Sequence, residues 1–229
     1  MADQRKITAL MPMRHSSERI PGKNYRPFGD DRPLFYHMLD TLLGCERISQ
    51  VVINTDSPNI AELCAKDYPS VRIVQRPEQL LGGGVPMNDI LRHDVALVGG
   101  DFFLQTHSTN PLIKLNTLQR AVDCFFDSYP IYDSLFTVTQ LQTRLYDQLA
   151  RPINHNPNIL LRTQDLPPIY EENSCIYVFE AKTILDTGMR IGRRPWMFPI
   201  DPIEARDIDI EYDFMLGEMA YRLTKGQGG

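Results

Sequence analysis

The sequence lacks cysteine pairs at the two-residue spacing that is typical of zinc knuckles and redox motifs. Its four cysteines are widely separated, so we expect reduced thiols, most of them buried. No apolar run approaches about eighteen residues, the length of a membrane-spanning helix. The first residues, MADQRKI, lack the apolar core of a signal peptide. These absences predict a cytoplasmic protein with no membrane partner.

An excess of positive charge is missing as well. Lys and Arg number 24 against 29 for Asp and Glu, which gives a net charge of -5 at pH 7. A general nucleic-acid binder is therefore not expected. The motifs G-x-G-x-x-G and G-x-x-x-x-G-K-[ST] are also absent, so neither a dinucleotide-binding fold nor a P-loop is supported.

Extended and helical patterns alternate along most of the chain. Apolar runs of strand length occur at 7–13, 50–56, 70–75, 101–107 and 134–142, and helical patterns separate them. This alternation predicts an α/β fold with a mostly parallel sheet and helices on both faces. A length of 229 residues suits one sizeable core. We therefore expect a single domain over residues 1–229.

The alternation breaks down between residues 144 and 170. The stretch RLYDQLARPINHNPNILLRTQDLPPIY is rich in Pro and Asn, with Leu and Ile interspersed. We expect an excursion rather than a linker, because its apolar residues need something to bury them. A partner subunit is one candidate. Strands are expected again at 174–180 and 196–201, followed by an amphipathic helix at 209–223.

Positive charge is concentrated in one short stretch, RHSSERIPGKN, residues 14–24. This stretch directly follows the strand predicted at 7–13, so it would lie at the carboxyl edge of the sheet, where open α/β folds bind ligands. Cations with hydroxyls and backbone N–H groups suit the oxygens of a nucleoside triphosphate. A solvated basic turn is the alternative interpretation.

The longer stretch MPMRHSSERIPGKNYRPFGDDRPL resembles the N-terminal signature of the acylneuraminate cytidylyltransferases, also called CMP-sialic acid synthetases. The family's loop reads roughly A-R-x-x-S-K-G-x-P-x-K-N. The chain matches it at Arg14, Ser17, Pro21, Lys23 and Asn24. Further matches follow in order at VVINTD, RPEQL, LQTHSTNPL, ENSCIYVF and RDIDIEYDF. The resemblance spans residues 7–220 and implies a Rossmann-like nucleotidyltransferase fold.

The resemblance implies transfer of CMP from CTP to the anomeric hydroxyl of an acidic nine-carbon 2-keto sugar, with release of pyrophosphate. Arg14 and Lys23 would hold phosphates and act in catalysis, because every reactant is anionic. The other implied nucleotide-binding residues are Ser17, Asn24, Arg76 and Asn88. The implied sugar-binding residues are Gln105, Ser108 and Asn173. Family members exchange an arm across a two-fold axis, which implies a homodimer with 144–170 as the dimerisation arm.

A pair of aspartates completes the predicted site. Asp207 and Asp209 alternate along an extended backbone, so both can face one side with Ile208 turned into the core. Two hard oxygen ligands suit Mg²⁺, and the resemblance implies that these two residues bind it, with Asp209 also catalytic. Either aspartate could instead cap the following helix.

Two other functions fit the same residues. Asp-x-Asp also holds the diphosphate in metal-dependent glycosyltransferases, although there it usually follows a mid-chain strand. A catalytically silent nucleotide-binding homologue is the third reading.

The chain departs from the family pattern at several positions. Glu18 stands where the family has Lys, and Arg19 follows in place of Gly. Glu171 and Glu172 stand where sialic acid synthetases often have Arg-Pro. A carboxylate pair is unfavourable beside an acidic sugar. Either these side chains point away from the sugar, or the sugar differs from N-acetylneuraminate.

Overall fold

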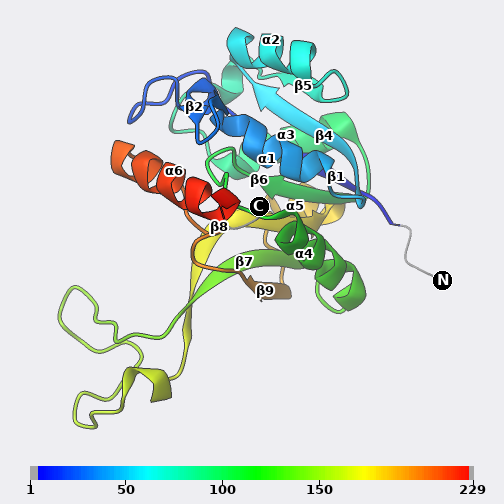
Figure 1. Ribbon diagram of the computed structural model, residues 1–229. Coiled ribbons are helices and arrows are strands. Elements are labelled where there is room, and N and C mark those ends of the chain that lie inside the picture. Colours follow the sequence, from blue (N-terminus) through cyan, green and yellow to red (C-terminus); the bar gives the residue numbers. More distant parts are fainter. Residues whose placement is uncertain (1–4, 227–229) are drawn as a thin grey trace.

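The computed structural model describes residues 5–226, in which a seven-stranded sheet has the order β5-β4-β1-β6-β8-β7-β9 (Figure 1). Its strands are β1 (Ile7–Leu10), β4 (Ile48–Thr55), β5 (Arg72–Gln75), β6 (Phe102–Thr106), β7 (Ser134–Leu141), β8 (Ile169–Glu180) and β9 (Pro195–Pro199). Pairing is parallel throughout, except that β8 runs against both β6 and β7. The prediction of a mostly parallel sheet is confirmed.

Helices cover both faces of the sheet. They are α1 (Leu34–Leu43), α2 (Pro58–Asp67) and α4 (Leu115–Ser128) on one face, and α3 (Met87–Val98) and α5 (Ala181–Thr187) on the other. On β1, Ala9 packs in a core with Leu39 and Phe125. Leu10 points the opposite way, into a core with Leu91 and Ile184. Neighbouring strand residues thus supply two hydrophobic layers.

Local signals in the sequence set the helix boundaries. The Ser57 hydroxyl accepts a hydrogen bond from the N–H of Ile60 at the start of α2. Pro58, the first residue of this helix, has no N–H that would need an acceptor. At the end of α1, the N–H of Gly44 bonds to the carbonyl of Asp40. α5 was not predicted, because its seven residues are too few to show a clear helical period.

The last helix, α6 (Glu211–Gly226), packs on a small hairpin of β2 (Pro27–Phe28) and β3 (Arg32–Pro33). The Phe28 ring lies edge-on to Phe214, with centroids 5.4 Å apart. Ile208, just before α6, is buried in the same cluster. This packing brings the predicted aspartates next to the loop that follows β1.

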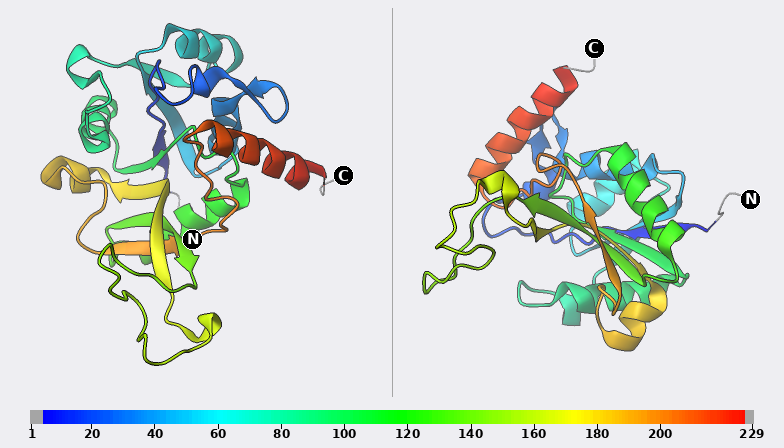
Figure 2. Two further views of the ribbon diagram at one scale, coloured as in Figure 1. Left: turned by 90° about the vertical axis from the view of Figure 1, so that its left-hand side faces the viewer. Right: turned by 90° about the horizontal axis from the view of Figure 1, so that it is seen from below.

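The connection between β7 and β8 projects away from the sheet (Figures 1 and 2). β8 begins at Ile169, earlier than the predicted strand at 174–180, because β7 keeps pairing with it as far as Leu141 and Ile169. Most of the predicted range 144–170 lies in this projecting connection, but its last residues belong to the sheet. Within residues 5–226, no helix combines the length and the apolar character needed to cross a membrane.

Candidate active site

A cavity of about 470 Å³ lies at the carboxyl edge of the sheet, where the loop after β1 meets the loop after β6 and the segment before α6. The predicted residues that line it are Arg14, Ser17, Lys23, Asn24, Arg76, Ser108, Asp207 and Asp209. These residues come from four separate stretches of the sequence. The structure thus brings most of the predicted nucleotide and metal ligands to one place.

The basic loop 14–24 is held in shape by its own polar contacts. The Asn24 amide donates to the carbonyl of Arg14 at 3.1 Å and accepts from the Ser108 hydroxyl at 2.8 Å. The Ser17 hydroxyl accepts the N–H of Ile20. Gly22 has φ of 67°, and a Cβ there would lie 2.8 Å from the Tyr25 ring, so this turn requires glycine. The loop is therefore a fixed wall of the cavity rather than a free basic turn.

Lys23 lies at the centre of the polar contacts. Its Nζ donates to the carbonyl of Ile208 at 2.6 Å and is 3.7 Å from Oδ1 of Asp209. Burial lowers the pKa of Lys23, and the charges of Asp209 and Asp207 act in the opposite direction. The side chain is only 11% exposed. Its ammonium is thus a largely desolvated cation fixed beside two carboxylates.

The two aspartates are held by contacts on both sides. The N–H of Ile208 bonds to the carbonyl of Thr109 at 2.9 Å, which ties this segment to the loop after β6. Asp209 accepts from Nη2 of Arg19 at 2.8 Å. Within the cleft, burial and then the charge of Asp209 raise the pKa of Asp207, although the residue keeps an exposed surface. Arg19, which replaces the family's Gly, therefore supplies a cation to the segment that carries Asp207 and Asp209.

The cap of α6 bears on whether Asp207 or Asp209 caps this helix or faces the cavity. Asp213 accepts the N–H groups of Ile210 and Asp209, at 3.0 and 3.1 Å. This is the reciprocal half of a capping box, supplied from inside the first turn. Asp213 therefore supplies a cap of this helix, and the carboxylates of Asp207 and Asp209 line the cavity.

Two predicted nucleotide ligands have other surroundings. Arg76 reaches the cavity wall, but its guanidinium donates to the side chain and carbonyl of Asn54 and to the carbonyl of Met13. Arg76 is only 4% exposed, and its bond to Met13 supports the start of the basic loop 14–24. Asn88 lies on α3, outside the described lining of the cavity, and donates to Sδ of Met189 at 3.4 Å.

The predicted sugar ligands Gln105 and Asn173 lie outside that lining too, on β6 and β8. The Asn173 amide exchanges hydrogen bonds with the hydroxyls of Thr137 and Thr139. Gln105 is fully buried, and its Oε1 accepts from Nη1 of Arg190 at 2.7 Å. Arg190 was missed from the sequence, although the cation-rich stretch MRIGRRP, residues 189–195, could have drawn attention to it.

His107 joins the two halves of the site. It lines the cavity, and its Nε2 is 3.0 Å from the Gln105 amide nitrogen. Burial first, and then the charges of Arg190 and Lys23, lower the pKa of His107 to about 4. The imidazole is therefore neutral near pH 7, and its Nε2 accepts a hydrogen bond from Gln105.

The lowered pKa of His107 predicts a loss of stability in acid. The unfolded chain takes up this proton near pH 6.5 and the folded protein only near pH 4. The neutral imidazole therefore contributes to the free energy of unfolding above pH 6.5, and this contribution is lost as the pH falls toward 4. We expect His107→Gln to show a smaller drop in melting temperature than the wild type between about pH 7 and about pH 5. Parallel curves for the two proteins would contradict this assignment.

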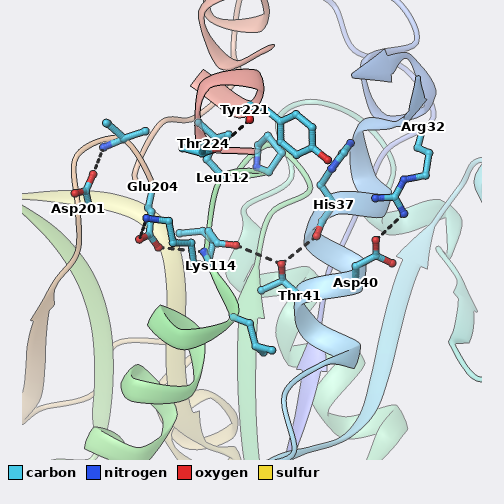
Figure 3. Close-up of a pocket in the computed structure, with 14 residues that line it drawn as sticks. Arg32, His37, Asp40, Thr41, Leu112, Lys114, Asp201, Glu204, Tyr221 and Thr224 are labelled. Carbon is cyan, nitrogen blue, oxygen red and sulfur yellow. Dashed lines mark hydrogen bonds and ion pairs between the residues drawn. The ribbon is translucent and has the colours of Figure 1, made fainter. Parts of the chain in front are cut away.

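A second cavity, of about 380 Å³, lies between α1, α6 and the start of α4 (Figure 3). Its charged walls are paired with each other: Lys114 is 3.4 Å from Glu204, and Arg32 donates to Asp40 at 2.7 Å. The Thr41 hydroxyl likewise bonds to backbone carbonyls. These contacts join α1 to the β2–β3 hairpin and to the segment before α4, and they join that segment to the loop that carries Glu204.

A family model described as "Cytidylyltransferase" matches residues 8–223. The chain belongs to the cytidylyltransferase family. This cytidylyltransferase is 27% identical to "CMP-N,N'-diacetyllegionaminic acid synthase" of Legionella pneumophila, over 96% of this chain and 98% of the relative. It is 22% identical to "N-acylneuraminate cytidylyltransferase" of Streptococcus agalactiae, over 92% of this chain and 52% of the relative. The resemblance predicted from the sequence is confirmed, and the protein is a nucleotidyltransferase.

Solved structures agree with this cytidylyltransferase in fold. One is a "CMP:2-keto-3-deoxy-manno-octonic acid synthetase complexed with CTP", with a TM-score of 0.67 at 13% identity, covering 96% of this chain and 99% of that chain. Another is a "4-diphosphocytidyl-2C-methyl-D-erythritol synthase" from Anaerococcus prevotii, with a TM-score of 0.69 at 11% identity, covering 95% and 98%. These two enzymes are named for different products, so the fold alone does not identify the acceptor.

Proposed function

We propose that the protein transfers CMP from CTP to the anomeric hydroxyl of a sialic-acid-like 2-keto sugar acid and releases pyrophosphate. The observation that carries this proposal is the arrangement of Lys23 and Arg19 opposite Asp207 and Asp209, across one cavity, in a cytidylyltransferase. The relative from Legionella and the one from Streptococcus are both named for sugar acids. A cytoplasmic location remains a prediction.

The charges of the site suit this reaction. The attacking hydroxyl belongs to an anion, CTP is an anion, and pyrophosphate leaves with more negative charge than it had as part of CTP. Arg14 and Lys23 would hold the triphosphate in line, and Lys23, being desolvated, would interact more strongly with developing charge than a solvated lysine would. The fixed loop 14–24 requires little rearrangement for this, which favours positioning.

Mg²⁺ is the metal that we propose for Asp207 and Asp209. The fit to Mg²⁺ depends on which donor atoms are present. The described residues contain no group of three or more His, Cys, Asp or Glu side chains able to hold a metal, so the site offers the two carboxylates and leaves the other positions to substrate and water. Two carboxylates with phosphate oxygens and water are a typical Mg²⁺ environment. Bound there, the metal would supply Lewis-acid stabilisation of phosphate oxygens and a lower pKa for the attacking hydroxyl.

Incubation with CTP, Mg²⁺ and a panel of 2-keto sugar acids, followed by a pyrophosphate assay, tests the proposal. We expect pyrophosphate and a CMP-sugar with at least one acid. Release of a nucleoside diphosphate from a nucleotide-sugar would instead identify the metal-dependent glycosyltransferase. Binding of CTP without turnover on any acid would identify a silent homologue.

We also propose that two copies associate through the connection between β7 and β8. Six of its apolar side chains are exposed, and Leu160 is 88% exposed. They are Tyr146, Leu149, Ile153, Ile159, Leu160 and Leu161. Such a surface favours burial against a second copy. Arg162 pairs with Asp165 of its own arm at 2.7 Å, so this pair would have to break for Arg162 to reach a partner's site.

The double variant Leu149→Asp/Leu160→Asp should convert the dimer to a monomer, because charges in an apolar interface lose solvation without gaining partners. Light scattering at micromolar concentration measures the mass. The matched control is Leu185→Asp, which changes an exposed leucine on α5 and should leave the mass unchanged. A monomeric wild type would sink the dimer proposal.

A further inference from the structure

Arg190 lies on the sugar side of the site, in the turn after α5, and its guanidinium is held in place. Its Nη1 donates to Oε1 of Gln105 at 2.7 Å. Its central carbon lies 3.6 Å from the centroid of the Tyr177 ring, a close cation–π contact. Only 16% of the side chain is exposed. Arg190 is therefore an oriented cation that a ligand can still reach.

The nearest counter-charge is held back from it. Among the described residues, Glu172 is the carboxylate within ion-pair range, and its Oε1 is 3.9 Å from Nη2 of Arg190, beyond hydrogen-bond distance. The Tyr177 hydroxyl donates to that same Oε1. Burial lowers the pKa of Arg190, which reflects the free energy of keeping this cation away from water. An anion from outside would compensate that cost.

Glu171 and Glu172 are not a pair at this place. Neighbouring residues of β8 point to opposite faces of the sheet, and the two are opposite different residues of β7, Thr139 and Val138. Both residues are exposed, but Glu172 accepts from the Tyr177 hydroxyl beside Arg190, whereas Glu171 lies on the other face. Thus one carboxylate, accompanied by an arginine, is present on the sugar side.

The donor chemistry of Arg190 also orients Gln105. A guanidinium has no acceptor, so the oxygen of Gln105 faces Arg190 and its nitrogen faces His107 and the carbonyl of Thr106. His107 in turn lines the cavity that holds Lys23 and Asp209. Arg190 is therefore linked to the reacting end of the site through two side chains.

We propose that Arg190 binds the carboxylate of the sugar acid and that Glu172 competes with that carboxylate for it. This rests on the proposed function. The carboxylate of a 2-keto sugar acid is attached to the anomeric carbon, so its receptor must be near the reaction site. Planar guanidinium donors match a carboxylate, and the fixed orientation reduces the entropy lost on binding.

The test compares the best sugar acid of the panel with its C1 carboxamide, which has the same shape without the charge. For Arg190→Gln we expect the preference for the acid, as a ratio of kcat/KM values, to fall by about 10- to 100-fold, because charged hydrogen bonds are the stronger ones. The KM for CTP should hardly change. Arg193→Gln, three residues further along in the same turn, is the matched control and should keep the preference.

Glu172→Gln provides a second measurement of opposite sign. It removes the competing charge and should lower the KM for the acid while leaving that for the carboxamide unchanged. An equal loss on acid and carboxamide in Arg190→Gln would overturn the proposal and show that Arg190 only positions Gln105. If Arg190→Gln does not fold, an unchanged KM for the acid in Glu172→Gln would overturn it instead. Wild-type protein that releases no pyrophosphate would refute the proposed function itself.

Discussion

Asp209→Asn should reduce pyrophosphate release by about 100-fold or more while CTP binding changes little. The substitution keeps the shape of the side chain, but it would weaken the proposed hard-metal ligand, whose effect on the barrier is on the order of several kcal/mol. Arg14, Lys23 and the loop's backbone donors remain to hold the triphosphate. Loss of an interaction made mainly in the transition state lowers turnover more than ground-state binding. Turnover, CTP affinity and melting temperature on one sample measure all three effects.

Asp213→Ala is the matched control for that experiment. Asp213 caps α6 through the N–H groups of Ile210 and Asp209 and is four residues from Asp209. Loss of this cap should cost about 1 kcal/mol of stability and leave most of the turnover of the folded protein. Near-normal turnover in Asp209→Asn would remove that residue from the active site, together with the main support for the metal.

Lys23→Gln should lower kcat by about 100- to 1,000-fold, the size of effect seen when one preorganised donor to a developing charge is removed. The ammonium is nearly buried, and its nitrogen is fixed 2.6 Å from the carbonyl of Ile208, so the charge is held in one place. Glutamine keeps a donor without the charge. Rapid-quench measurement of the CMP-transfer step separates chemistry from CTP binding.

Lys66→Gln is the control, because it removes an exposed lysine on α2. It should match the wild type in both kcat and KM. If Lys23→Gln raised the KM for CTP and left kcat intact, Lys23 would be only a ground-state phosphate ligand.

The sheet and its ligand edge could be predicted from the sequence, because both follow from local pattern. Buried parallel strands have short apolar runs, and the basic loop comes directly after the first of them. Asp207 and Asp209 were predicted to face one side, and the burial of Ile208 between them explains why they do.

The rest could not be predicted, since it depends on contacts between distant segments. Arg190 lies 85 positions from its acceptor Gln105, and Arg19 lies 190 from Asp209. Arg76 was predicted to bind nucleotide from its place in the family resemblance, yet its Nε and Nη2 donate to Asn54 and Met13. No pattern of spacing along the chain reports such pairings.

The reversed direction of β8 has a consequence for how subunits and substrate affect one another. Because β8 runs against its neighbours, its beginning rather than its end reaches the ligand edge, and the chain arrives there straight from the projecting arm. Glu172 and Asn173 lie in that first half of β8. If the proposed dimer forms through the arm and orders this half of β8, its association and its affinity for the sugar are thermodynamically linked, and each shifts the other by the same factor. Dilution of the protein should therefore weaken sugar binding, and sugar should strengthen the dimer.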